Sequence, residues 1–209
     1  MLAYPVSKKP IDYSKPVFMQ PKLDGVRCLI QLNKGKYHHK LGVWDPMTEV
    51  VAYSRTGKIW KNIDHILEEL ESFFDKHPNV VLDGELYNHD FKDDFESIIS
   101  MVRKTKPTDV DRLISRENVQ FHCYDIVNKK LKYENRKKFI SQNLPNKYCL
   151  KHVYTWIVSS EDEAKIAHES NLAAGYEGSI VRLNVPYECK RSHSLRKFKD
   201  FQDAEANIV

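Results

Sequence analysis

The chain has 209 residues, 41% of them hydrophobic and 30% charged, with a formal net charge of +4. These proportions describe an ordinary globular protein and exclude a disordered chain or a membrane fold, so we expect no membrane partner. The length allows one sizeable core or at most two small domains. The N-terminal segment has lysines and prolines where a signal peptide needs an unbroken apolar run, which predicts an intracellular protein.

Short segments rich in Val, Ile, Tyr and Phe predict the β-strands. In chain order they cover residues 17–21, 26–32, 50–54, 80–87, 119–127, 152–158 and 178–183. Apolar residues at helical spacing predict a helix over 62–77, with Asn62 as its N-cap. Further helices are expected at 94–104, 133–142 and 160–175, the last beginning at Ser160 and ending at Gly175. The predicted class is α+β, with mostly antiparallel sheets flanked by helices in one domain.

The stretch "QPKLDGVRC" places a lysine at the end of a predicted strand. Lys22 stands two residues before Asp24, with Gly25 and Arg27 just beyond. Taken alone, this pattern is typical of a surface lysine at a turn, because Asp-Gly is a common hairpin pair. Other residues of the sequence are needed to distinguish a surface turn from a functional site.

Other charged residues also occupy predicted strands. Asp83 and Glu85 point to one face because side chains alternate along a strand, and Glu177 precedes the strand "GSIVRL". Lys197 and Lys199 share a face of any strand that contains them. Singly, these residues fit strand ends, turns or a solvated edge. Together, however, these residues suit a site for a nucleoside triphosphate and one divalent metal. The lysines would bind the phosphates, and the carboxylates would bind the metal and the ribose. The predicted chemistry is nucleotidyl transfer to a lysine.

Six short motifs then resemble those of the covalent nucleotidyltransferase superfamily. "KLDGVR" resembles motif I (KxDGxR), "SRTGK" the Ser-Arg segment after it, "LDGEL" motif III, "FHCYDIV" motif IIIa, "EGSIVR" motif IV and "LRKFK" motif V. Their order and spacing are also those of the family. The tail "KFKDFQDAEANIV" is similar to the segment by which ATP-dependent DNA ligases pass from motif V into an OB-fold domain. The resemblance begins near Pro16, and small viral and phage ligases fit best.

The resemblance implies a covalent nucleotidyltransferase fold, an ATP-grasp-like DNA ligase adenylation domain, over residues 1–203. Residues 204–209 would begin the connection to an OB-fold domain, which acts in cis in this family and is missing from this chain. A monomer is expected. The compartment would be the host cytoplasm for a phage protein, and the nucleus or cytoplasm for a protein of a eukaryotic virus.

Carried over by motif, Lys22 is the residue that ATP adenylates. An ordinary lysine has a pKa of ~10.4, so near pH 7 only on the order of one in a few thousand is uncharged and nucleophilic. The resemblance therefore implies activation by desolvation, by a bound metal and by the neighbouring cations Arg27, Lys197 and Lys199. Lys197 and Lys199 would also neutralise the α-phosphate in the transition state.

The remaining motif residues take binding roles by the same resemblance. Glu85 would hold ribose or metal, and Glu177 would place the divalent ion, Mg²⁺ or Mn²⁺. Tyr124 would stack on adenine, its alternative being a core tyrosine. Arg55 and Arg191 resemble arginines that contact ribose, phosphate or the nick.

Three further motif residues have less specific expectations. Asp24 would shape the loop or assist Lys22, and Gly25 would permit a tight turn beside the nucleotide. Arg182 ends motif IV, where some relatives carry lysine.

The expected function is that of an ATP-dependent DNA ligase adenylation domain in replication, repair or recombination. Lys22 would form lysyl-AMP, the AMP would pass to the 5′-phosphate of nicked duplex DNA, and the 3′-OH would seal the nick. An RNA ligase and an mRNA capping guanylyltransferase share KxDGxR, although "SRTGK" and "DAEA" lean away from both. The third alternative is a nucleotide- or nick-binding module without turnover. The presence of Lys22, Glu85 and Glu177 argues against it, because a module that only binds would be free to lose its nucleophile.

Overall fold

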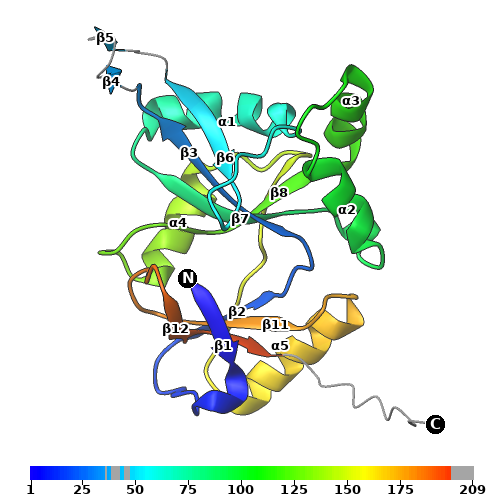
Figure 1. Cartoon of the computed structure of the whole chain (residues 1–209). Coiled ribbons are helices and arrows are strands. Elements are labelled where there is room, and N and C mark those ends of the chain that lie inside the picture. Colours follow the sequence, from blue (N-terminus) through cyan, green and yellow to red (C-terminus); the bar gives the residue numbers. More distant parts are fainter. Residues whose placement is uncertain (36, 39–42, 45–47, 199–209) are drawn as a thin grey trace, which may run out of the picture. The chain divides into compact units, whose positions relative to one another are not determined.

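The computed structural model describes residues 1–35, 37, 38, 43, 44 and 48–198 (Figure 1). The chain divides into two compact units. The terminal unit comprises Met1–Leu23 and Tyr154–Val209, and the central unit comprises Asp24–Val153. The expected boundary at residues 203 and 204 lies outside the described residues.

The central unit is built on a five-stranded sheet in the order β6-β3-β7-β8-β9. All neighbouring strands are antiparallel except the parallel pair β8 and β9. The strands are β3 (Val26–Asn33), β6 (Glu49–Tyr53), β7 (Val81–Tyr87), β8 (Gln120–Ile126) and β9 (Leu150–His152). The two-residue strands β4 (Tyr37–His38) and β5 (Val43–Trp44) pair with each other. The helices are α1 (Asp64–Lys76), α2 (Phe95–Val102), α3 (Asp109–Asn118) and α4 (Tyr133–Asn143), with a 3₁₀ turn η2 (His89–Phe91).

Side chains alternate along the strands, so one face of this sheet is apolar and the other is polar. Ile30 and Leu82 are fully buried in one hydrophobic core with Leu70 of α1, Ile98 of α2 and Ile140 of α4. Burying such a side chain contributes about 1.5–3 kcal/mol. Side chains at the intervening positions point to the opposite face, and that face carries the charged residues of the strands.

The terminal unit also contains a five-stranded sheet, in the order β1-β12-β11-β2-β10. Its pairs are antiparallel except for β1 with β12. The elements are β1 (Leu2–Pro5), η1 (Val6–Lys8), β2 (Val17–Pro21), β10 (Trp156–Val158), α5 (Glu161–Ala173), β11 (Ser179–Leu183) and β12 (Arg191–Phe198). Helix α5 covers one face, where Ala164 and Ala167 join a small core with Val17, Met19 and Val181.

The α+β class with mostly antiparallel sheets is confirmed, but two local predictions are wrong. The predicted strand 152–158 is two strands, because β9 pairs with β8 and β10 pairs with β2 in the other unit. Asn62 does not cap α1, whose N-cap position is Ile63. Instead, Asn62 donates hydrogen bonds to the carbonyls of Met101 and Asp111 at 2.9 and 3.2 Å.

The predicted ends of α5 are confirmed. The Ser160 side chain accepts a hydrogen bond from the Glu163 amide at 3.1 Å. Gly175, just beyond the helix, has a φ of 87°, which glycine adopts without steric cost. Strands β1 and β12 and helix α3 were not among the predicted elements.

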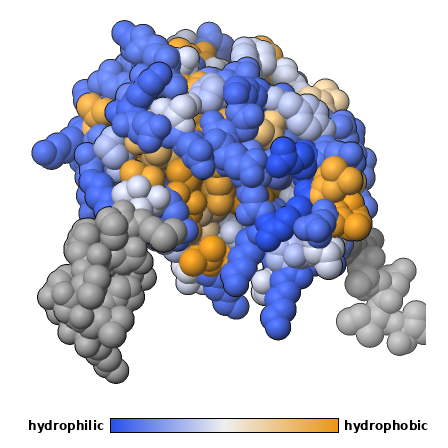
Figure 2. All heavy atoms as spheres, turned by 90° about the horizontal axis from the view of Figure 1, so that it is seen from above, coloured by the Kyte–Doolittle hydropathy of each residue, from blue (hydrophilic) through white to orange (hydrophobic). Residues whose placement is uncertain are grey.

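The face of the molecule drawn in Figure 2 is mainly hydrophilic, with apolar side chains gathered in small areas. Exposed apolar residues include Val110, Leu113 and Ile114 of α3. In the part of the chain that the structure describes, no helix has both the length and the apolar character needed to cross a membrane.

Candidate active site

Lys22 directly follows β2 and continues its pairing with the segment before β11. The Lys22 amide donates a hydrogen bond to the Gly178 carbonyl at 2.9 Å, which extends the ladder beyond the end of the strand. This pairing places Lys22 beside Glu177, and the two side chains form an ion pair. Their side chains are 21% and 26% exposed, so a ligand in solution can reach both. The structure therefore brings the expected nucleophile together with the motif IV carboxylate.

The register of the same sheet places Lys197. In β11, Ile180 lies between Lys197 of β12 and Gln20 of β2. Residues paired directly across strands share a face, so Lys197 lies on the face of Gln20, two residues before Lys22. The next residue, Phe198, stacks at 3.9 Å on His168 of α5, on the opposite face. Lys199 lies outside the described residues.

Two arginines of the terminal unit take part in hydrogen bonds that support the sheet. Arg182 is buried, and its Nε donates to Gln20 Oε1 at 2.6 Å. Arg191 is exposed at the start of β12, and its Nη1 donates to the Ala3 carbonyl at 2.9 Å. Its guanidinium also lies over the Tyr4 ring at 5.5 Å. Each arginine thus has a structural contact in the absence of a nucleotide.

In the central unit, Arg27 of β3 forms a bidentate ion pair with Asp83 of β7. Nε lies 3.0 Å from Oδ1 and Nη2 lies 2.9 Å from Oδ2. Asp83 is 1% exposed, so the pair holds the guanidinium in one orientation. The sequence grouped Asp83 with the site carboxylates but did not identify it as the partner of Arg27.

Glu85 lies in the centre of the polar face of this sheet. It pairs with Arg27 on one side and His122 on the other, and the Tyr124 hydroxyl donates to its Oε2 at 3.4 Å. Withdrawal of the carboxyl from water, and secondly the nearby Asp83 carboxylate, raise the pKa of Glu85 to about 8. A perturbed carboxyl among polar side chains is typical of a ligand-binding position. The structure therefore brings Arg27, Glu85 and Tyr124 together on one face.

Gly25 is required because its neighbours leave no space. A Cβ atom there would lie 2.5 Å from the Leu86 carbonyl oxygen and 2.7 Å from Glu85 Cγ. Its φ is not positive, so close approach to β7 rather than a left-handed turn explains the glycine. Asp24, the residue before it, is exposed.

His122 belongs to the same polar face but was not predicted as a site residue. It lies two residues before Tyr124 in β8, and its Nε2 is 3.0 Å from Gln120 Oε1. Burial lowers the pKa of His122 to about 4, which keeps the ring neutral at pH 7. The i, i+2 spacing of His122 and Tyr124 was the signal that could have identified it.

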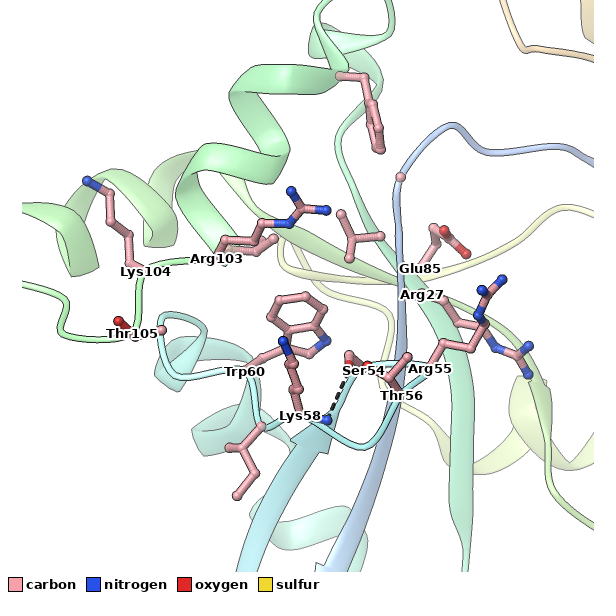
Figure 3. Close-up of a pocket in the computed structure, with 15 residues that line it drawn as sticks. Arg27, Ser54, Arg55, Thr56, Lys58, Trp60, Glu85, Arg103, Lys104 and Thr105 are labelled. Carbon is pink, nitrogen blue, oxygen red and sulfur yellow. Dashed lines mark hydrogen bonds between the residues drawn. The ribbon is translucent and has the colours of Figure 1, made fainter.

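A hollow of about 750 Å³ in the central unit lies beside these residues (Figure 3). We call it the basic pocket, and its lining includes Gly25, Arg27, Arg55, Lys58, Trp60, Glu85 and Arg103. Arg55 is exposed in the loop that follows β6, and its side chain extends on the same side of the pocket as Arg27 and Glu85 (Figure 3).

The carboxylates of Glu85 and Glu177 are of the ligand type that a hard divalent cation prefers. Mg²⁺ is usually bound through one or two carboxylates, with substrate phosphates and water completing its shell. Glu177 and Glu85 are oxygen donors of this kind, in the terminal and central units respectively. Among the described residues, no group of three or more His, Cys, Asp or Glu side chains could hold a metal ion by itself.

Comparison with known proteins gives a consistent result. The sequence model of the family described as "ATP dependent DNA ligase domain" matches residues 1–199. The DNA ligase of Enterobacteria phage T6 is 25% identical, over 93% of this chain and 46% of that protein. The DNA ligase of African swine fever virus, in a Malawi tick isolate, is 31% identical, over 77% of this chain and 39% of that protein. This chain therefore spans less than half the length of these relatives.

Solved structures show the same fold. Chlorella virus DNA ligase-adenylate gives a TM-score of 0.66 at 19% identity, covering 98% of this chain and 67% of that one. The ATP-dependent DNA ligase of bacteriophage T7, in complex with ATP, gives a TM-score of 0.65 at 17% identity, covering 95% of this chain and 67% of that one.

Proposed function

The chain belongs to the family of ATP-dependent DNA ligase domains, and we propose that it is an adenylation domain whose Lys22 attacks the α-phosphate of ATP. The Nζ lone pair forms a bond to phosphorus while the bond to pyrophosphate breaks and Nζ loses a proton. The AMP then passes from Lys22 to the 5′-phosphate of a DNA nick, and the 3′-OH displaces AMP to close the strand. The observation that carries the proposal is the pairing of Lys22 with Glu177 on an extended β2–β11 ladder.

In this proposal the ion pair would also control the nucleophile. The Glu177 carboxylate favours the charged form of Lys22, which cannot attack. Glu177 would exchange Lys22 for Mg²⁺ or Mn²⁺ when the nucleotide binds, and this ion would neutralise phosphate charge. Lys197 lies on the same face of the sheet and would attract the α-phosphate; we assign the same role to Lys199.

The polar face of the central unit supplies the nucleotide contacts in this proposal. The ring of Tyr124 would stack on adenine, and Glu85 would accept a ribose hydroxyl or a metal ion. Arg27 and Arg55 would contact phosphate or ribose, and Asp24 would orient the loop before β3. Arg191 would contact ribose, phosphate or the nick after its guanidinium releases the Ala3 carbonyl.

The finer assignments follow from the family's motif order. We propose nicked duplex DNA as the substrate, an OB-fold domain in cis as the second DNA-binding surface, and a monomeric enzyme. We also propose an intracellular location, which is where ATP and the nicks of replicating or repaired DNA occur.

Intact mass spectrometry after incubation with ATP and magnesium tests the proposal. We expect a gain of one AMP that is absent in Lys22→Ala and absent when GTP replaces ATP. The adduct should discharge on nicked duplex DNA rather than on nicked RNA. A parent chain without the mass gain, or a Lys22→Ala variant that keeps it, would overturn the assignment.

A further inference from the structure

His168 of α5 contacts the adjoining ends of two strands in the terminal unit. Its side chain is buried, and its Nδ1 lies 3.0 Å from the hydroxyl oxygen of Ser179 at the start of β11. Its imidazole ring also stacks on Phe198 at the end of β12, with an angle of 7° between the ring planes. One side chain of the helix therefore holds two strand ends that carry or adjoin the expected catalytic residues.

The same helix holds the loop that carries Glu177. After Glu177, the buried Ser179 hydroxyl also accepts a hydrogen bond from Asn171 Nδ2 at 2.8 Å. Before Glu177, the Tyr176 amide donates a hydrogen bond to the Asn171 carbonyl at 3.0 Å. Glu177 thus lies between two residues that are both hydrogen-bonded to α5, so the position of its carboxylate depends on this helix.

Strand register connects these contacts with the lysines. Ser179 pairs directly with Phe198 on one side and with Pro21 on the other. Pro21 precedes Lys22, and Phe198 follows Lys197. Successive side chains of a strand point to opposite faces. A contact that fixes Phe198 on the face of α5 therefore also fixes the direction in which Lys197 leaves the other face.

We propose that His168 is a positioning residue for nucleotidyl transfer to Lys22. Its hydrogen bond to Ser179 holds the Glu177 loop, and its stack on the ring of Phe198 holds Lys197. This inference rests on the proposed function and adds to it a residue on the face of the sheet opposite the reacting atoms. Such a residue acts on the chemical step, because a catalytic group displaced by about 1 Å can cost on the order of a hundredfold in rate.

The rate of lysyl-AMP formation, followed by intact mass over a range of ATP concentrations, tests this role. His168→Ala should lower the rate constant at saturating ATP about ten- to a hundredfold. The ATP concentration that gives half the maximal rate should not change, which is the pattern of an interaction made only in the transition state. His168→Phe keeps a flat ring for the stack on Phe198, so it should recover most of the lost rate.

Ala167→Gly is the matched control, because Ala167 is the buried neighbour of His168 in α5. Glycine weakens a helix interior, so this variant should lower the melting temperature and keep the parent rate. A side chain that only stabilises the helix would behave in the same way. Equal rate constants for His168→Ala and Ala167→Gly, measured where both are folded, would therefore overturn the proposal.

Phe198→Ala removes the same stack from the other strand, and Phe198 is only partly buried, so this variant should fold. It should lose about as much rate as His168→Ala. The double variant should lose no more than His168→Ala alone, because both changes remove one contact. Additive losses in the double variant would show that the two rings act separately, which would contradict the proposal.

Amide hydrogen exchange without ATP gives a readout that does not depend on activity. Exchange in residues 175–179 and 191–198 should be faster in His168→Ala than in Ala167→Gly, with β3 and β7 of the central unit unchanged. Equal exchange in the two variants would overturn the positioning role. A parent chain that forms no lysyl-AMP would instead defeat the proposed function, and the exchange would still decide whether His168 holds these segments.

Discussion

Lys22 and Glu177, 155 positions apart in the sequence, form an ion pair next to the hydrogen bond between the Lys22 amide and the Gly178 carbonyl. The backbone pairing fixes where the lysine leaves the sheet, and the carboxylate holds its ammonium group. The same contact holds the ammonium group of the expected nucleophile, so the proposed adenylation would require Lys22 to exchange the Glu177 carboxylate for another partner.

Replacing Lys22 by alanine should abolish the lysyl-AMP adduct. Arginine should fail as well, because its guanidinium stays charged and is not a nucleophile, although it can keep the pair with Glu177. Intact mass after incubation with ATP and magnesium measures the adduct. Lys8→Ala, at an exposed position of the same unit, is the control and should label like the parent. Normal labelling in either Lys22 variant would place the nucleophile elsewhere.

Replacing Tyr124 by alanine should weaken ATP binding by roughly 1–3 kcal/mol, the range found for stacking of a base on an aromatic ring. Tyr124→Phe keeps the ring and removes only the long hydrogen bond of 3.4 Å to Glu85, so it should bind ATP nearly as well as the parent. Calorimetric titration with ATP measures both affinities. If the alanine variant binds like the parent, Tyr124 has only a packing role.

The buried pair of Arg136 with Asp125 should be the ion pair whose loss most destabilises the central unit. Both side chains are at most 1% exposed, with Nε 2.7 Å from Oδ1. Arg136→Met leaves a buried carboxylate without its partner, which should lower the free energy of unfolding by about 3–5 kcal/mol. Chemical denaturation measures the loss.

Arg116→Met is the control for this prediction, because its pair with Glu68 is more than half exposed on both sides and should contribute little. Combining Arg136→Met with Asp125→Leu should recover part of the stability, since no charge is then left buried. Equal losses in Arg136→Met and Arg116→Met would contradict the argument.

His122 should make stability depend on pH below 7. Burial lowers its pKa from 6.5 to about 4 in the folded chain, so between these values the unfolded chain binds more protons than the folded one. Stability is then complete above pH 6.5 and falls as the pH drops towards 4, by at most about 3 kcal/mol. His122→Gln removes the titrating ring, so denaturation curves from pH 4 to 7 should be flatter for this variant. Parallel curves for variant and parent would show that the ring is hydrated.

Part of the site could be predicted because it depends on local patterns. The alternation in "VVLDGELY" predicts that Glu85 lies on the same face of its strand as Asp83, and the structure adds a hydrogen bond from Tyr124 to Glu85. Ser160 and Gly175 mark the ends of α5 by cap chemistry that involves only neighbouring residues. Helix α3 has an equally local signal, the capping box of Thr108 and Asp111, although it was not among the predicted elements.

Other features could not be derived from local patterns. The segment 152–158 has a continuous strand composition, but Val153 and Tyr154 fall on either side of the boundary between the units. Asp83 could have been a metal ligand or the partner of an arginine, and only the register of β3 against β7 selects Arg27. The basic pocket combines a loop after β6 with the end of α2, which no sequence pattern connects.

The sequence by itself therefore determined the α+β class, the family through its ordered motifs, and which residue types could carry the chemistry. Side-chain alternation, helix capping and turn preference are short-range effects, so neighbouring residues are enough to express them. Only the tertiary structure decided the partners: Glu177 for Lys22 and Asp83 for Arg27. Strand register and helix packing set these contacts. Both depend on the burial of apolar side chains from distant segments in a common core. A short stretch of sequence carries no information about which distant segments meet in that core.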